Sequence, residues 1–297
     1  MEAEGIPIWA LTPQNESNVC GWHWETHCFT AEESAEFVGA HLGPKLDAAG
    51  YGDILLLGYD HNKGDGLLPE FAEAAYGASA ADASWAQYHD GMAHHWYKNA
   101  LEHYPEELDE THAIDPTKLL MATEQSLDSF TWAESYLAAW QNDAWWWENL
   151  APDWTHGPMA KAVGRYAKAI ITDLNHHTSA WISWNAALDS AGGPNHRNNA
   201  CTADVMVDLS SGDVYYTPTF YVMQHFTRYI RPGSHILDST GAEPMNLMSV
   251  AAINTDGSVS VVVFNEHDQP QTYAVRYQDS VVEVQAPAAS IQTVEFR

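Results

Sequence analysis

The chain has 297 residues, 45% of them hydrophobic, so it can bury one large core or two smaller ones. Its net charge is −28, from 40 acidic against 12 basic side chains. This charge repels nucleic-acid backbones and anionic membrane surfaces, so we expect no nucleic-acid partner and favour a neutral ligand. No apolar run reaches the roughly 18 residues of a transmembrane helix, so we expect no membrane span.

The N-terminus resembles the middle of a domain. Glu2–Gly5 has the pattern of the last helical turn closed by glycine, and an apolar strand follows at once. We therefore expect sequence upstream of Met1. The first nine residues lack the basic and apolar regions of a signal peptide. The compartment stays open, with a secreted or periplasmic location favoured.

Three cysteines, Cys20, Cys28 and Cys201, form no metal-binding spacing, and an odd count is a poor disulfide framework. We interpret them as free thiols that serve as small apolar residues.

Up to about Ile230, short apolar runs alternate with segments of helical periodicity. The predicted strands are Ile6–Leu11, Asp53–Tyr59, Gly91–Tyr97, Lys118–Thr123 and Ser179–Trp184. The clearest predicted helices are 30–46, opened by a Thr30–Glu33 capping box, then 161–174 and 220–230. This alternation predicts an α/β fold with a parallel sheet and crossover helices. A closed (β/α)₈ barrel needs eight strands, and only five can be counted here.

After Ser234 the pattern changes to short strands alone. They are predicted at Met248–Ile253, Ser258–Phe264, Thr272–Tyr277, Val281–Val284 and Ile291–Phe296. Asn254–Gly257 is typical of a hairpin turn between the first two. We therefore expect two domains, an α/β domain over residues 1–233 and an antiparallel β-domain over residues 234–297.

Two glutamates end apolar strands: Glu16 follows the first strand and Glu124 the fourth. In a parallel barrel the carboxyl ends of the strands face the active site. Two carboxylates from different strands are the minimum equipment for cleaving a glycosidic bond, and the amide of Asn15 beside Glu16 can hold a sugar hydroxyl. The ordinary alternative is a pair of solvated glutamates in loops.

Aromatic and imidazole side chains end two further strands. In His94–Tyr97, strand alternation puts His95 and Tyr97 on one face, where they can bind sugar hydroxyls or orient a carboxylate. The alternative is that they are core aromatics. Trp184 ends the fifth strand, and the turn at Gly192–Asn195 follows it, a combination that suits a sugar platform. The alternative is that Gly-Gly-Pro is only a turn.

Metal and cofactor chemistry are less favoured. The histidine clusters at 22–27, 94–95 and 176–177 match no recognised ligand spacing, so we expect no catalytic metal. The sequence has no Walker loop, no GxGxxG after a strand and no GxSxG elbow, which argues against nucleotide binding and α/β-hydrolase chemistry. We expect no cofactor.

Seven segments, in order, resemble glycoside hydrolase family 30, on the branch of the glucosylceramidases and related bacterial β-glucosidases and β-xylosidases. They are LTPQNES (11–17), FTAEESAEFVGAHLGPKL (29–46), YDHN (59–62), GMAHHWY (91–97), LLMATE (119–124), AWISWNAALDSAGGPNH (180–196) and FYVMQHFTRYIRPGS (220–234). The C-terminal strands DGSVSVVVFN and SIQTVEF resemble the family's side β-domain.

The resemblance implies a (β/α)₈ TIM barrel, of which this chain holds strands four to eight, with a C-terminal antiparallel β-sandwich. It implies a retaining mechanism with Glu16 as acid/base and Glu124 as nucleophile. Asn15 would hold the sugar 2-hydroxyl. The remaining implied site residues are His95 and Tyr97 near the nucleophile, Trp184 as platform, and Asn199 beyond the GGPN turn.

Two departures matter. Ser17 stands where the family usually has proline, and the family's first three strands have no counterpart in the chain.

The favoured interpretation is a retaining β-glycosidase acting on β-glucosides, with glucosylceramide-like glycolipid, β-glucan or β-xyloside substrates. The alternative is an inactive or partner-dependent fragment that binds carbohydrate weakly, with a homo-oligomer or another chain covering the open barrel edges.

Overall fold

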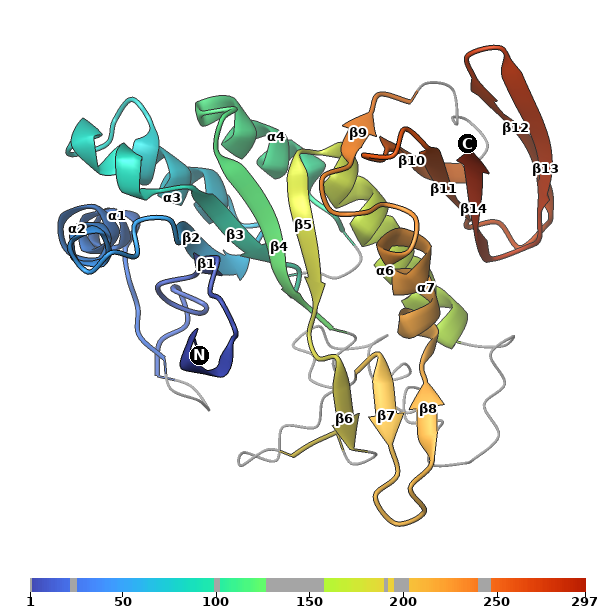
Figure 1. Cartoon of the computed structure of the whole chain (residues 1–297), viewed down its shortest axis with the longest axis horizontal. Coiled ribbons are helices and arrows are strands. Elements are labelled where there is room, and N and C mark those ends of the chain that lie inside the picture. Colours follow the sequence, from blue (N-terminus) through green and yellow to red (C-terminus); the bar gives the residue numbers. More distant parts are fainter. Residues whose placement is uncertain are drawn as a thin grey trace. The chain divides into compact units, whose positions relative to one another are not determined.

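The computed structural model describes residues 2–21, 26–98, 102–126, 158–189, 192–194, 203–239 and 247–297 (Figure 1). The chain divides into two compact units. The first comprises residues 1–125 and 176–182, and the second comprises residues 126–175 and 183–297. Each unit is described by itself below. None of the described helices is long and apolar enough to cross a membrane.

The first unit is built on a five-stranded sheet in the order β1-β2-β3-β4-β5, with parallel pairing from β1 to β4. The strands are β1 (Ala10–Leu11), β2 (Leu55–Asn62), β3 (Gly91–His95), β4 (Leu119–Gln125) and β5 (Thr178–Ser183). All five predicted strands are present, and the half-barrel expectation is confirmed. The first strand is shorter than the predicted range Ile6–Leu11, because Pro7 in that range cannot donate a backbone hydrogen bond to a neighbouring strand.

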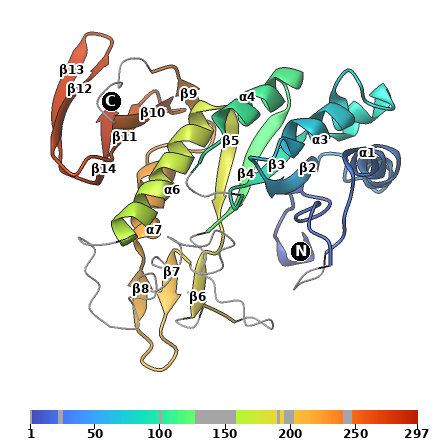
Figure 2. The same cartoon turned by 180° about the vertical axis from the view of Figure 1, so that it is seen from behind.

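Helices lie along one side of this sheet in both views (Figures 1 and 2). They are α1 (Ala31–Glu36), the π-helical turn η2 (Phe37–Leu42), α2 (Gly43–Ala48), α3 (Leu67–Tyr76), the short 3₁₀ helix η3 (Ala83–Tyr88) and α4 (Pro105–Ile114). The predicted capping box opens α1: the Glu33 backbone N donates to Thr30 Oγ1 at 3.1 Å, and the Thr30 backbone N donates to Glu33 Oε2 at 2.9 Å.

Strand alternation divides the apolar side chains of the sheet between two faces. Met92 and Leu120 pack with Leu68 and other residues of the helices. Ala93 and Met121 belong to a separate buried cluster with Leu57. Because side chains two residues apart share a face, His95 is expected on the face of Ala93, away from the helices.

The second unit contains α6 (Pro158–Asn175), α7 (Pro218–Thr227) and a C-terminal β-sandwich. One sheet has the order β14-β11-β10-β9 and the other is the hairpin β12–β13. The strands are β9 (His235–Leu237), β10 (Leu247–Ile253), β11 (Val259–Asn265), β12 (Gln271–Tyr277), β13 (Ser280–Ala286) and β14 (Ser290–Phe296). Apolar side chains of β12, among them Tyr273 and Val275, pack on those of β11, including Val261.

The predicted turn between β10 and β11 is confirmed, since Asn254 N donates to Ser258 O at 2.8 Å and Gly257 N to Asn254 O at 2.9 Å. One small sheet was not predicted from the sequence. It consists of β6 (Ala187–Asp189), β7 (Val205–Val207) and β8 (Val214–Tyr216). Its strands are three residues each, too short to produce a recognisable periodicity.

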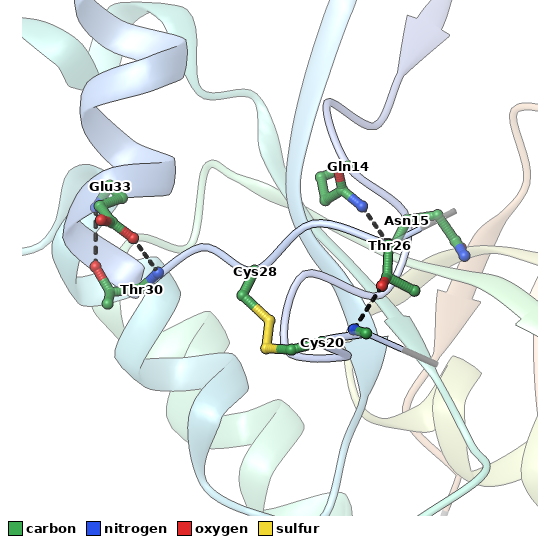
Figure 3. The surroundings of a disulfide bond; sticks show 8 residues. Gln14, Asn15, Cys20, Thr26, Cys28, Thr30 and Glu33 are labelled. Atoms are coloured by element: carbon green, nitrogen blue, oxygen red, sulfur yellow. Dashed lines mark hydrogen bonds between the residues drawn. A yellow bond between two sulfur atoms is a disulfide. The ribbon is translucent and has the colours of Figure 1, made fainter. Parts of the chain in front are cut away.

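The interpretation of Cys20 and Cys28 as free thiols is wrong: they form a disulfide, with Cα atoms 5.5 Å apart (Figure 3). The chain turns back on itself between them. Phe29 N donates to Ser17 O at 2.9 Å, and Gly21 N donates to Thr26 Oγ1 at 2.8 Å. The odd number of cysteines concealed this local pair, because counting cannot show which two meet. The disulfide closes the loop that follows Glu16 and leads into α1.

Thiol titration tests this disulfide. The unfolded chain should show one reactive thiol before reduction and three afterwards, since one pair is bonded among three cysteines. Replacing Cys20 and Cys28 with serine should lower the free energy of unfolding by about 2–3 kcal/mol, the expected effect of closing so short a loop. Cys201→Ser is the control, which should retain the disulfide and lose the single thiol. Three reactive thiols without reduction would contradict the assignment.

Candidate active site

Glu16 lies just beyond β1 and is 8% exposed. Two hydrogen bonds tie its loop to β2: Glu16 N donates to Asp60 O at 2.8 Å, and Ser17 Oγ donates to Tyr59 O at 2.7 Å. The residue is therefore held by the carboxyl end of the neighbouring strand, and it is not a freely solvated loop glutamate. Ser17, which stands where the family that the sequence resembles usually has proline, supplies one of these bonds.

The backbone is left-handed at three residues of this region. The φ angles are 50° at Glu16, 69° at Tyr59 and 50° at Asp60. Residues with a Cβ adopt this region at a cost of about 1–3 kcal/mol each, and such residues concentrate at functional sites. The conformation turns the Asp60 carboxylate toward β3 and β4, where its hydrogen-bond partners lie.

His95 at the end of β3 connects the carboxylates and is 1% exposed. Its Nε2 lies 3.2 Å from Asp60 Oδ1 and 4.0 Å from Glu124 Oε2, while its Nδ1 lies 3.5 Å from Glu16 Oε1. One imidazole thus meets three acidic side chains from three different segments.

These contacts decide the charge of His95. Burial alone would lower its pKa, but the hydrogen bond with Asp60, the close carboxylate of Glu16 and the charge of Glu124 outweigh burial and raise the pKa to about 10. Burial would also raise the pKa of Asp60. The hydrogen bond from His95, its positive charge and the hydroxyls of Thr12 and Thr123 lower the pKa instead. At neutral pH the pair is an imidazolium and a carboxylate.

Glu124 at the end of β4 has a carboxyl group whose pKa is raised toward neutrality. Burial raises its pKa, the positive charge of His95 opposes this, and the charges of Glu16 and Asp60 raise it further, to about 7. The nearby side chain of Tyr97 favours the ionised form. One carboxylate oxygen of Glu124 lies within 4.8 Å of one of Glu16. The two glutamates predicted to act together are therefore adjacent.

Hydrogen bonds with residues at the end of β2 hold the end of β3 in place. Tyr97 N donates to Asn62 Oδ1 at 2.7 Å, and Lys63 N donates to His95 O at 3.1 Å. The rings of His95 and Tyr97 meet edge to face with centroids 6.0 Å apart. The prediction that these two side chains share a face is confirmed.

Asn15 precedes Glu16 and is exposed. Its carbonyl accepts a hydrogen bond from Gln14 Nε2 at 2.8 Å (Figure 3). Its side-chain amide bonds to none of the described residues, which leaves it available to a ligand.

Glu16, His95 and Glu124 also have the donor types of a metal site, with one ligand atom from each within 4.8 Å of the others. A metal ion requires a neutral imidazole. Because the pKa of His95 is about 10, a proton competes for that nitrogen at neutral pH. The donor set therefore suits proton chemistry better than metal binding.

Two predicted site residues are not among the described residues of the first unit. Trp184 belongs to the second unit, where it follows β5 with 44% of its surface exposed. The turn beyond it is tied to Asp189, whose side chain accepts from Gly193 N at 3.0 Å. Asn199 lies outside the described residues.

Asp60 and Thr123 are the site residues that sequence reasoning missed. Thr123 Oγ1 donates to Asp60 Oδ1 at 2.6 Å, so the aspartate accepts from both β3 and β4. Asp60 is a charged residue that follows the apolar run of its strand, in the segment YDHN. That pattern, the same one that singled out Glu124, could have identified it.

The chain matches the glycosyl hydrolase family 30 TIM-barrel domain over residues 1–230 and the family 30 beta sandwich domain over residues 233–294. It is 30% identical to lysosomal acid glucosylceramidase of Mus musculus, over 99% of this chain and 53% of that protein. It is 26% identical to the endo-1,6-beta-D-glucanase BGN16.3 of Trichoderma harzianum, over 89% of this chain and 46% of that protein.

Solved structures agree with these matches. SrfJ from Salmonella typhimurium superposes with a TM-score of 0.82 at 26% identity, covering 100% of this chain and 59% of that chain. The endo-beta1,6-glucanase BT3312 superposes with a TM-score of 0.79 at 25% identity, covering 99% and 59%. The chain spans about half the length of the relatives that it matches.

The charge of His95 makes stability depend on pH. Its pKa is raised from an ordinary 6.5 to about 10, so its contribution is fully present below pH 6.5 and lost as pH rises through about 10. In urea unfolding at a series of pH values, the wild-type protein should lose stability across this window, and His95→Gln should lose much less. His41→Gln, at an exposed position, should behave as wild type. Equal slopes for wild type and His95→Gln would contradict the assigned charge.

Proposed function

Because the chain belongs to glycosyl hydrolase family 30, we propose that it carries the catalytic machinery of a retaining β-glycosidase. Glu124 is the nucleophile and Glu16 is the acid/base. The observation that carries this proposal is the approach of their carboxylate oxygens to within 4.8 Å. Retaining enzymes hold the two carboxyl groups about 5–5.5 Å apart, whereas inverting enzymes leave about 6.5–9.5 Å for a water molecule.

In the first step, a carboxylate oxygen of Glu124 attacks the anomeric carbon. The bond to the aglycone oxygen breaks, and that oxygen takes the proton of Glu16. In the second step, water gives its proton to Glu16 and attacks the anomeric carbon, and the ester bond to Glu124 breaks. The first step therefore moves one negative charge from Glu124 to Glu16.

His95 suits this transfer because it touches both glutamates. Its nitrogens lie 3.5 Å from Glu16 and 4.0 Å from Glu124. With an effective dielectric constant of about 20, attraction to an imidazolium is worth about 5 kcal/mol at the shorter distance and about 4 kcal/mol at the longer. Attraction to His95 thus favours the two charge states to a similar extent, while burial and the charges of Glu16 and Asp60 keep the pKa of Glu124 raised.

The remaining predicted site residues bind the sugar or orient the nucleophile. Asn15 holds the sugar 2-hydroxyl, and Tyr97, whose side chain interacts with Glu124, orients that carboxylate. Trp184, with its exposed ring, stacks on the apolar face of the sugar. Asn199 is assigned a sugar-binding role by the family resemblance alone.

The substrate is a β-glucoside. Relatives named as glucosylceramidases support a glycolipid, and relatives named as endo-1,6-β-glucanases support a β-glucan. A β-xyloside is a further candidate. The disulfide between Cys20 and Cys28 supports an oxidising environment, which agrees with a secreted or periplasmic location.

A second candidate is a protein that acts only with a partner. Among the described strands β1 pairs with β2 alone, and Trp9 and Ile6 beside it are 58% and 51% exposed. Ile182 at the opposite edge of the sheet is 45% exposed. Open edges of this kind favour pairing with further strands, supplied by another polypeptide or a second copy.

An aryl β-glucoside assay tests the proposal on residues 1–297. Glu124→Gln should lower kcat/KM by a factor on the order of 10⁴, because the nucleophile is lost. The exposed Glu283→Gln should match wild type. Nuclear magnetic resonance of the fresh product should show the β-anomer first, as retention requires.

Each outcome separates the alternatives. Full activity in Glu124→Gln would exclude this residue as nucleophile, and an α-anomer formed first would exclude retention. No turnover by the chain alone, followed by turnover on co-expression with three further βα units, would favour the partner-dependent candidate.

A further inference from the structure

Trp184 in the second unit is not enclosed by the core, since 44% of the residue's surface is exposed. A stacking platform must nevertheless present its face in a fixed direction. The orientation of the ring must therefore come from the backbone on either side, at Ser183 and Asn185.

Asp204 contacts both of these neighbours. Ser183 Oγ donates to Asp204 Oδ1 at 3.3 Å, and Asp204 N donates to Asn185 O at 3.2 Å. The next backbone bond, from Val205 N to Ala186 O at 3.1 Å, begins the pairing of β6 with β7. One residue thus holds the chain immediately before and immediately after the tryptophan.

Asp204 is itself held firmly. Its carbonyl accepts from both the backbone N and the Oγ1 of Thr217, each at 3.0 Å, and its carboxylate accepts from Thr219. Both threonines lie at the start of α7. The Ser183 hydroxyl also bonds the hydroxyl of Tyr166 on α6 at 2.9 Å. The clamp on Trp184 is therefore connected to two helices of the same unit.

We propose that Asp204 is a positioning residue that fixes the direction of the Trp184 ring for stacking on the sugar. The inference rests on the proposed function, in which Trp184 is the platform. A platform binds the ground state and the transition state alike, so its loss raises KM more than it lowers kcat. The alternative is that Asp204 serves only to stabilise the start of α7, with no effect on the ring.

Fluorine magnetic resonance of the full chain labelled with 5-fluorotryptophan distinguishes these two roles. Trp184→Phe identifies the resonance of Trp184 among the 13 tryptophans. Asp204→Ala should shift and broaden that resonance and leave the rest of the spectrum in place. Asp204→Asn, which keeps one acceptor oxygen, should shift it less. The control Asp213→Asn, on the exposed hairpin of the same unit, should leave it unchanged.

An unchanged Trp184 resonance in Asp204→Ala overturns the proposal, whether or not the protein hydrolyses sugars. If Asp204→Ala unfolds the protein, so that all tryptophan resonances change, Asp204→Asn and Ser183→Ala replace it as the test variants. Each of these should move the Trp184 resonance, and no movement in either overturns the proposal.

Kinetics with an aryl β-glucoside test the link to the substrate. Asp204→Ala should raise KM about tenfold and change kcat by less than about twofold. An active variant with a displaced Trp184 resonance and an unchanged KM overturns the role in sugar binding. A wild-type chain with no turnover counts against the proposed function, and the resonance data on Asp204 still stand.

Discussion

The active-site region depends on one buried positive charge, the imidazolium of His95. Around it lie Asp60 at 3.2 Å, Glu16 at 3.5 Å and Glu124 at 4.0 Å. Three carboxylates this close would repel one another strongly in a buried site. The imidazolium makes the cluster tolerable, and the carboxylates in turn raise the pKa of His95 to about 10. The charge states of His95, Asp60 and Glu124 are therefore coupled.

This cluster explains several local features of the fold. Its members come from the loop after β1 and from the carboxyl ends of β2, β3 and β4, so the parallel order of the strands is what brings them together. Left-handed backbone at Asp60 and the bond from Thr123 direct its carboxylate to His95. Hydrogen bonds from Glu16 N and Ser17 Oγ to β2 hold the acid/base candidate in place. The left-handed backbone at Glu16, Tyr59 and Asp60 therefore lies at the charged cluster itself.

Sequence alone predicted the elements with long periodic patterns and the polar residues that interrupt them. Glu16, Glu124 and His95 were found because a charge or imidazole at a strand end is conspicuous. Asp60 was missed although, like Glu124, it lies one residue past the predicted end of its strand, and its role follows from contacts with His95 and Thr123 that no spacing reveals. The Cys20–Cys28 pair escaped because only the return of the loop brings the two sulfurs together. The three-residue strands β6 to β8 depend on pairing, not on propensity.

Covalent trapping tests the central claim that Glu124 is the nucleophile of this cluster. A 2-deoxy-2-fluoro-β-glucoside with a good leaving group slows the second step and accumulates the glycosyl-enzyme. Mass spectrometry of the digested protein should find one fluorosugar, attached to Glu124, and none on Glu124→Gln. A fluorosugar on Glu16 or on Asp60, or continued turnover with no adduct, would contradict the account.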